Sequence, residues 1–444
     1  MGYTPKYCFL VLCFLASTGL LPPVHCTTDK FSNSAADFLL KIQNGFENSS
    51  ISLKDELFVA QNIDKVGSNF DCPASVSPTV PESVHLLRPG DIGIIGALGD
   101  SLTAAYGAGA NSFSPVMFEY PGEASSIGGD KTLEEIITLP NIFRKYNSHL
   151  YGYSTGLSVI LTQPFNKRLN VAISGSYATD MPGQARELIQ TMKDDPSVDF
   201  ENDWKLITLF IGGNDLCSGC LYAESSPANY IKFVEKTIQI LHDESPRTFV
   251  NVIGIMQANQ IMKLQGPTIC NLITSVFCPC ALGGSIPQQY VYLKAREMQR
   301  LLRNSVESGK YDDKDDFTAV YQPFLEDSSV PTLPDGDVDR SFFAPDCFHL
   351  SQKGQAAQST ANWNNLFEPV GSKDTSYDTG EKINCPSQDF PYLYTNVNSK
   401  PGFLTKLQKS HTFGNEVPNT NATSMPRDLR DHVHEINTIL RLVP

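Results

Sequence analysis

Positive charge is scarce in this sequence. The chain has 34 Lys and Arg residues against 48 Asp and Glu residues, which gives a formal net charge of −14 at pH 7. There is no basic stripe that could neutralise the phosphates of a nucleic acid, and no polybasic patch that could hold the chain on an anionic membrane. Nucleic acid is therefore not an expected partner. We give the acidic balance no meaning beyond solubility.

Other absences narrow the class of protein. No stretch after the first 26 residues approaches the ~18 apolar residues that a membrane span needs, and no lipid-anchor tail is visible. Gly128-Gly129-Asp130 lacks the lysine of a phosphate-binding loop. No internal repeat is found, and no spacing of His, Cys, Asp and Glu predicts a metal site. We therefore expect neither a cofactor nor a metal.

The first 26 residues have the pattern of a signal peptide. Lys6 gives a basic start, residues 7–21 are apolar, and residues 24–26 offer a cleavage site. A membrane anchor is the alternative, but the run is short and Pro22-Pro23 follows it. We expect a secreted chain with no transmembrane segment after cleavage.

Removal of residues 1–26 leaves eight of the 11 cysteines, an even number that suggests disulfides in a secreted chain. Cys217 and Cys220 are close enough in sequence to form a local bridge. Three cysteines within residues 270–280 are expected to tie that loop to another segment. A bridge at Cys347 would hold the turn that carries it. The sequons at Asn48 and Asn421 predict glycosylation.

Between residues 84 and 367, apolar runs alternate with amphipathic ones. Such alternation predicts a parallel sheet covered by helices, which is an α/β fold with a three-layer α/β/α sandwich and a central sheet of about five strands. The candidate strands are Ile92–Leu98, Leu169–Ile173, Leu206–Ile211, Phe249–Met256 and Phe317–Tyr321, and the candidate helices are Gln184–Lys193, Asn229–His242, Gln288–Val306 and Ser351–Leu366. We expect an N-terminal extension over 27–80, the main domain over 81–372 and a polar C-terminal extension over 373–444.

A serine follows the first of these strands. The buried run breaks at Gly99 and continues as Asp100-Ser101-Leu102. A hydroxyl at this position lies at the carboxyl edge of the sheet, where open α/β sheets bind ligands. Taken alone, the serine could equally cap the next helix.

Two further segments favour catalysis. Asn214 follows the strand that ends at Ile211, and Asp346 precedes His349 by three residues, so that a carboxylate and an imidazole can meet across one turn. Serine, histidine and a carboxylate are the parts of a nucleophilic hydrolase. A side-chain amide and backbone N–H groups are the parts of an oxyanion hole.

The chain resembles the serine hydrolases of the GDSL (SGNH) family, and within that family the repeat unit of the membrane-associated phospholipases B. The match covers roughly residues 80–400. Besides the Gly-Asp-Ser-Leu segment, it rests on residues 127–130, 138–142, 180–182, 203–206, 214–217, 346–349, 363–371 and 385–387. The resemblance implies a flavodoxin-like strand order. It also implies Ser101, Asp346 and His349 as catalytic residues, with the N–H groups of Ser101 and Gly175 and the amide of Asn214 as the oxyanion hole.

By resemblance, the expected substrate is a phospholipid or another lipid ester, with phospholipase A and lysophospholipase activities. A membrane or micelle surface is the candidate place for the reaction. One alternative is a general lipase or esterase on neutral glycerides or retinyl esters. Another is a catalytically silent lipid-binding protein. The apolar loop over 106–130 suits an acyl chain, although it could also pack its own aromatic side chains.

Overall fold

The computed structural model describes residues 66–111, 118–159, 165–264, 268–282 and 284–405. The expected signal peptide and the two sequons, at Asn48 and Asn421, lie outside the described residues. The chain divides into two compact units, residues 1–399 and 400–444, and only 400–405 of the second unit are described. Among the described helices, none has the length and apolar character needed to cross a membrane.

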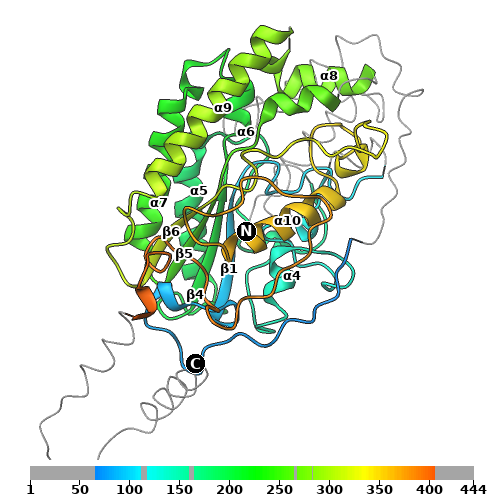
Figure 1. The fold of residues 1–444 in the computed structure, drawn as a ribbon. Helices are drawn as coiled ribbons and strands as arrows, with labels where there is room; N and C mark the ends of the chain where they lie inside the picture. The colour runs from blue at the N-terminus through cyan, green and yellow to red at the C-terminus, as the bar shows by residue number, and fades with distance from the viewer. Residues whose placement is uncertain (1–65, 112–117, 160–164, 265–267, 283, 406–444) are drawn as a thin grey trace, which may run out of the picture. The chain divides into compact units, whose positions relative to one another are not determined.

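A parallel sheet of four regular strands forms the centre of the first unit (Figure 1). Its order is β1-β4-β5-β6, and helices cover both faces, so that the strand residues are almost all buried. These strands confirm four of the predicted ones. Their bounds are β1 (Ile92–Gly99), β4 (Trp204–Phe210), β5 (Thr248–Ile253) and β6 (Phe317–Gln322). A separate antiparallel pair joins β2 (Phe118–Glu119) and β3 (Ser158–Val159).

The fifth predicted strand, Leu169–Ile173, is not a regular strand. Its backbone still pairs with the free edge of β1, because Ala97 donates to Leu169, and Val171 donates back to Ala97. A last bond runs from Ile173 N to Gly99 O at 3.3 Å. The segment occupies the edge position that completes the flavodoxin-like order, but a single parallel bridge is too little for a continuous ladder.

The helices lie in two layers (Figure 1). One face of the sheet carries α5 (Met181–Asp194), α7 (Pro227–Glu244) and α9 (Ser285–Val306), and the other carries α4 (Leu139–Phe143) and α10 (Gln352–Leu366). The four long helices agree with the predicted ones. Local sequence explains where they begin. Ser226 caps α7 and Ser351 caps α10, each by accepting a backbone N–H in the first turn.

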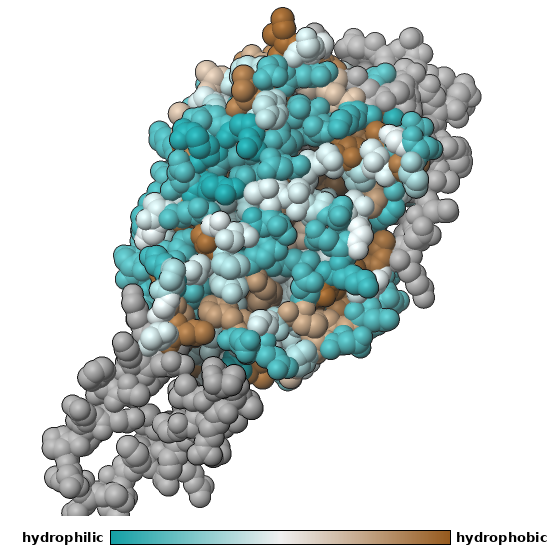
Figure 2. Space-filling view, viewed as in Figure 1, coloured by the Kyte–Doolittle hydropathy of each residue, from teal (hydrophilic) through white to brown (hydrophobic). Residues whose placement is uncertain are grey.

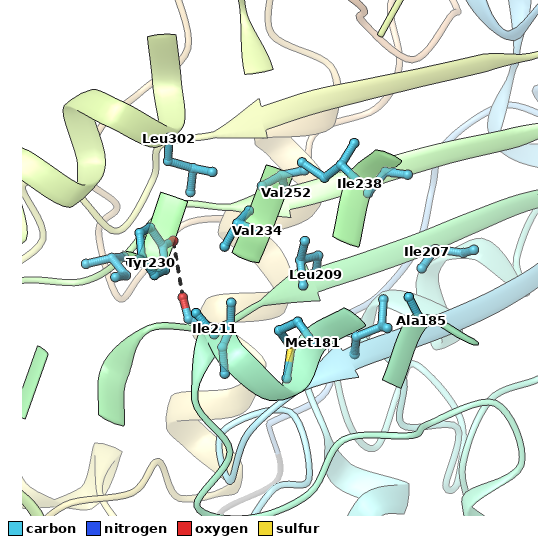
Figure 3. Packing of buried hydrophobic residues seen from close by; sticks show 14 of the residues in the cluster. Met181, Ala185, Ile207, Leu209, Ile211, Tyr230, Val234, Ile238, Val252 and Leu302 are labelled. Carbon is cyan, nitrogen blue, oxygen red and sulfur yellow. Dashed lines mark hydrogen bonds between the residues drawn. The ribbon is translucent and has the colours of Figure 1, made fainter. Parts of the chain in front are cut away.

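Two hydrophobic clusters form the core, one on each face of the sheet. Alternate strand residues face opposite sides, so Ile207 and Leu209 pack toward α5 and α7, whereas Leu206 packs toward α4 and α10. Figure 3 shows the first cluster, in which Tyr230 of α7 also donates a hydrogen bond to Ile211 O at 3.4 Å. This bond fixes Ile211, which directly follows β4 and lies three residues before Asn214.

The compact unit extends to Ser399, beyond the domain boundary expected at residue 372. The polar composition of residues 373–399 favours a boundary at residue 372, but side chains of this segment bond to the core. Leu393 is fully buried, and its N–H donates to Leu87 O at 2.8 Å. The Asn398 amide donates to His85 O at 2.9 Å. Asparagine and threonine here satisfy buried backbone groups rather than facing solvent.

Candidate active site

Ser101 lies on a tight turn at the carboxyl end of β1. Leu102 N donates to the Asp100 carboxylate at 3.0 Å, and Tyr106 N donates to Ser101 O at 2.9 Å. Gly99 allows the turn to pack closely, since a Cβ there would lie 2.4 Å from Thr103 Oγ1 and 2.5 Å from Phe210 O. The sequence thus places the hydroxyl on a rigid turn rather than on a flexible loop.

Asp346 and His349 lie on a second turn, just before α10. Asp346 Oδ1 accepts the N–H groups of Phe348 and His349, both at 3.0 Å. The turn closes where Ala344 N donates to His349 O at 2.8 Å. Cys347 adopts a left-handed conformation with φ of 57°. The carboxylate therefore shapes the turn as well as facing the imidazole.

The structure brings these two turns together. His349 Nδ1 lies 2.6 Å from Asp346 Oδ2, and His349 Nε2 lies 2.8 Å from Ser101 Oγ. The exposed fractions of Ser101, Asp346 and His349 are 5%, 1% and 1%. A carboxylate can only accept, so Nδ1 carries the proton and Nε2 accepts from the serine hydroxyl. This arrangement can abstract the proton of a nucleophilic serine.

The three expected oxyanion donors follow the ends of neighbouring segments at the same edge. Gly175 has φ of 87°, in the region that favours glycine, and comes two residues after the end of Leu169–Ile173. Asn214 is in the first turn of α6 (Gly213–Ser218), where its amide donates to Ser176 O at 2.9 Å. Within the described residues, no protein group accepts the N–H of Ser101, the N–H of Gly175 or the second amide hydrogen of Asn214. All three donors are available to a ligand.

Four disulfides connect the described cysteines: Cys72–Cys385, Cys217–Cys278, Cys220–Cys280 and Cys270–Cys347. The expected local bridge between Cys217 and Cys220 is wrong. Cys217 lies in α6 and Cys220 lies two residues after that helix, and each of them bonds to the segment after α8 (Thr268–Phe277), which the sequence had marked as a loop to be tied elsewhere.

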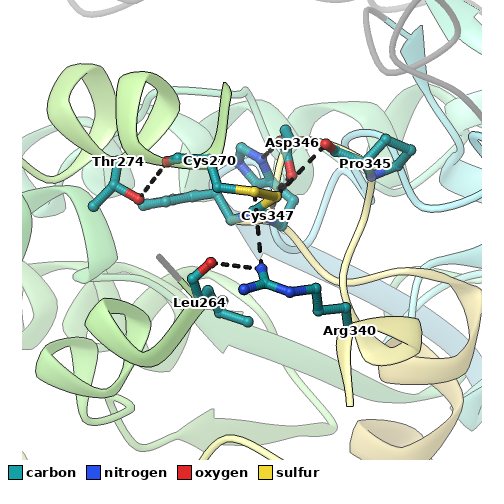
Figure 4. Close-up of a disulfide and its surroundings, with 9 residues drawn as sticks. Leu264, Cys270, Thr274, Arg340, Pro345, Asp346 and Cys347 are labelled. Carbon is teal, nitrogen blue, oxygen red and sulfur yellow. Dashed lines mark hydrogen bonds and ion pairs between the residues drawn. A yellow bond between two sulfur atoms is a disulfide. The ribbon is translucent and has the colours of Figure 1, made fainter. Parts of the chain in front are cut away.

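The bridge at Cys347 joins the turn of Asp346 and His349 to α8 (Figure 4). Arg340 lies beside this bridge, and its guanidinium donates to Leu264 O. The Thr274 hydroxyl donates to Cys270 O at 2.9 Å and holds the helical end of the bridge. Phe277, at the end of α8, packs on His349 with ring centroids 5.6 Å apart. The histidine is thus held on one side by α8 through a covalent link and a ring contact.

The family model for GDSL-like lipases and acylhydrolases matches residues 95–361. This range includes both turns and all three expected oxyanion donors. The chain belongs to the GDSL-like lipase/acylhydrolase family. It is thus a member of a family of carboxylic ester hydrolases that act on lipid esters.

Three relatives of this GDSL-like chain carry the name "Phospholipase B1, membrane-associated". The chain is 41% identical to the mouse protein over 379 residues, which are 82% of this chain, and 40% identical to the human protein over 401 residues, which are 87% of it. The rat protein is 38% identical over 379 residues. In each case the match covers 26% of the relative, so this chain spans about a quarter of the length of these proteins.

Gln184 is a site residue that the sequence analysis missed in this GDSL-like hydrolase. Its amide oxygen accepts from Gly99 N at 2.9 Å, and its amide nitrogen donates to Gly99 O at 2.9 Å and to Ser176 Oγ at 3.1 Å. One buried side chain thus joins the turn of Ser101 to the turn of Gly175. The sequence did contain a sign of this role, because Gln184 is a polar residue on the face of α5 that Met181 and Leu188 fill with apolar groups.

A buried ion pair near Gly175 was also missed. Glu119 Oε2 lies 2.6 Å from Lys167 Nζ, and both side chains are almost completely buried. The other carboxylate oxygen of Glu119 accepts from Ser174 Oγ at 2.6 Å, and Ser158 Oγ donates to Oε2 at 3.1 Å. The pair anchors the residue directly before Gly175. No spacing in the sequence relates residues 119, 167 and 174, so pattern reasoning could not have found it.

Two aspartates beside the site have perturbed pKa values. Burial raises the pKa of Asp100 to about 6 and that of Asp215 to about 7. Asp215 Oδ2 accepts from Ala178 N at 3.0 Å, so this carboxyl group supports the backbone that follows Gly175. In the described part of the chain, no group of three His, Cys, Asp or Glu side chains could hold a metal ion.

Proposed function

We propose that the protein is a secreted phospholipase of the B type, which cleaves fatty-acyl esters of phospholipids through an acyl-enzyme on Ser101. The observation that carries the proposal is the continuous contact from Ser101 Oγ to His349 Nε2, at 2.8 Å, and from His349 Nδ1 to Asp346, at 2.6 Å. Family membership supports ester hydrolysis. The name of the relatives supports a phospholipid as the substrate.

In the first half-reaction, His349 Nε2 takes the proton of Ser101 as Oγ bonds to the ester carbonyl carbon. The carbonyl oxygen becomes an oxyanion, which the N–H groups of Ser101 and Gly175 and the amide of Asn214 stabilise. The ester C–O bond then breaks. The leaving alcohol takes the proton from Nε2, and the acyl group remains on Ser101.

In the second half-reaction, a water molecule gives a proton to Nε2 and attacks the acyl carbon. The bond to Ser101 Oγ breaks, Oγ recovers the proton, and the fatty acid leaves. Asp346 holds the imidazole in the tautomer that accepts at Nε2 and stabilises the imidazolium formed in each half-reaction.

Secretion is part of the proposal. It rests on the signal-peptide pattern of residues 1–26 and on the pairing of all eight remaining cysteines in disulfides, which persist in oxidising compartments. The expected glycans at Asn48 and Asn421 belong to the same proposal. Mass spectrometry of the secreted protein after alkylation tests the start of the mature chain, the glycans and the absence of free thiols together.

The purified chain should release fatty acids from mixed phospholipid and triglyceride vesicles. We expect release from the phospholipid, and Ser101→Ala should abolish both this release and labelling by a fluorophosphonate.

In Asn214→Ala, kcat should fall by roughly 10²- to 10³-fold, the usual cost of one lost oxyanion donor. Release from triglyceride alone would favour a general lipase. Near-normal turnover in Ser101→Ala would refute the proposed nucleophile.

A further inference from the structure

A long segment beside the candidate active site carries no charge. From Leu264 to Leu293 the sequence has no Asp, Glu, Lys, Arg or His, although the whole chain has 82 charged residues (48 + 34). The described part of this segment includes α8 and the first turns of α9. Helices that cross over between parallel strands run opposite to them, so α9 begins at the carboxyl edge of the sheet, where Ser101 lies.

Exposed apolar side chains gather at the start of α9. Ile286, Tyr290 and Leu293 are 83%, 43% and 57% exposed, and spacings of four and three residues place them on one helix face. Leu221 and Tyr222 add exposed fractions of 57% and 40%. We call these five residues the apolar rim. Figure 2 shows hydrophobic side chains projecting at the upper end of the view, over the first turns of α9.

The two parts of the apolar rim are held to each other. Tyr290 of α9 donates to Gly219 O at 3.0 Å, directly before the loop that carries Leu221 and Tyr222. Cys220 in the same loop is bonded to Cys280, five residues before α9 begins at Ser285. The rim is therefore a fixed surface, whose shape does not depend on a partner.

Covalent links also join the apolar rim to the candidate catalytic groups. Phe277 contacts His349, and the next residue, Cys278, is bonded to Cys217 of α6. Asn214 lies in the first turn of α6, a helix of six residues that is roughly 9 Å long at 1.5 Å per residue. A surface that binds the rim is thus held close to the oxyanion donors.

We infer that the apolar rim docks on the surface of an uncharged or zwitterionic lipid aggregate and so presents Ser101 to its substrate. This inference rests on the proposed function. Exposed aliphatic side chains next to tyrosines suit the boundary between headgroups and acyl chains. The net charge of −14 opposes adsorption on anionic lipid. Binding should therefore need no anionic lipid and should not weaken when salt screens charges.

The test uses the full chain and phosphatidylcholine vesicles. The variant Ile286→Glu with Leu293→Glu places two charges on the rim, and each lost apolar contact weakens vesicle binding by about tenfold. Val80→Glu is the matched control, because Val80 is 67% exposed and precedes Pro81, whose carbonyl accepts from Trp204 at the opposite end of β4. Binding is measured by co-sedimentation at low and high salt.

The double variant should bind vesicles at least tenfold more weakly and lose vesicle hydrolysis in proportion, while its turnover of a soluble short-chain ester stays at the wild-type value. The inference would be overturned if wild type and the double variant bound vesicles equally, or if Val80→Glu lost as much vesicle binding as the double variant. Vesicle binding that requires anionic lipid would overturn it as well. If wild type is a dimer, the double variant is a monomer and both bind vesicles equally, the rim serves self-association instead. If wild type cleaves no ester at all, the proposed function fails, whereas co-sedimentation still decides the docking surface.

Discussion

Gln184 holds the backbone of the nucleophile turn from a neighbouring helix. It satisfies both the N–H and the C=O of Gly99, two residues before Ser101. Its amide nitrogen also donates to Ser176 Oγ, in the turn after Gly175. In the proposed mechanism the oxyanion hole takes donors from both turns, so the distance between the turns decides how well these donors fit an oxyanion. Gln184 is a positioning residue, because it acts through the turns and does not touch the reacting atoms.

Gln184→Ala should lower kcat for a soluble short-chain ester by roughly 10- to 100-fold, since small misplacements of catalytic groups have effects of this size. KM should change little, because Gln184 acts through the two turns and does not touch the substrate. Gln190→Ala on the same helix is the control, as Gln190 is exposed and bonds only to Asp194 among the described residues. An unchanged kcat in a folded Gln184→Ala protein, or a change in KM alone, would contradict the positioning role.

Asp215 predicts a pH dependence of stability. Burial raises the pKa of its side chain in the folded protein to about 7, whereas an aspartate in an unfolded chain has a pKa of about 3.9. Between these values the folded state holds a proton that the unfolded state has lost, so the free energy of unfolding falls as pH rises through this window, by a few kcal/mol from this group. Asp215→Asn removes the titration and still accepts from Ala178 N.

Urea unfolding of wild type and Asp215→Asn at pH 4 and pH 8 measures this contribution. The two proteins should have similar stability at pH 4, and the variant should be the more stable at pH 8. Asp389→Asn, at an exposed position, controls for the loss of one charge. A difference between wild type and Asp215→Asn that stays constant from pH 4 to pH 8 would rule the burial effect out.

At the level of elements, α8 is linked to the turn that carries Asp346 and His349. The Cys270–Cys347 bridge and the packing of Phe277 on His349 connect this helix to the proposed general base, His349, from two directions. Tyr106 packs on the same ring, with centroids 4.6 Å apart. The imidazole is therefore held between Tyr106, which follows the turn of Ser101, and α8.

The double variant Cys270→Ser/Cys347→Ser should lose most of its turnover of a soluble ester, by on the order of 10-fold or more. Its fold should remain, because the other three bridges are untouched. Circular dichroism and the kinetics of the same samples provide the measurement. Wild-type kcat in a protein confirmed to lack this bridge would mean that the Asp346 carboxylate, which accepts two backbone N–H groups, holds the turn unaided.

Local patterns predicted the elements that carry the site, because each depends on its own sequence. Four buried strands and four long helices follow from apolar runs and amphipathic periodicity, and the Gly-Asp-Ser-Leu segment marks the nucleophile turn. The apolar run of Leu169–Ile173 predicted a regular strand, but the segment makes only a few bonds to β1, and an apolar run does not record how continuously a segment pairs. The pairing of Cys217 with Cys278 depends on how α6 and the segment after α8 meet in space, which no spacing records.

At the scale of the whole molecule, the first and the last described segments of the compact unit meet on the α4 and α10 face. Phe70 packs edge-on against Tyr146, and Tyr146 stacks on Trp363 of α10. Trp363 donates to Asn384 O at 2.8 Å, next to the bridge between Cys385 and Cys72. Composition suggested two polar extensions, but the parts from 66 to 80 and from 373 to 399 close the domain.

The Cys72–Cys385 bridge should therefore support stability and not catalysis. It closes a loop with a sequence separation of 313 residues, and the entropy of loop closure grows only logarithmically, so the other bridges inside the loop reduce its effect little. Cys72→Ser/Cys385→Ser should lower the free energy of unfolding by roughly 2–5 kcal/mol. Its kcat on a soluble ester should match that of wild type, because the bridge lies beside α10 and away from both catalytic turns. Denaturant unfolding and kinetics on one preparation test both parts.

Cys270→Ser/Cys347→Ser is the matched comparison, and it should have a large effect on kcat. If removal of Cys72–Cys385 lowered kcat as much as removal of Cys270–Cys347 while leaving stability unchanged, the division between a structural and a site-holding bridge would be wrong.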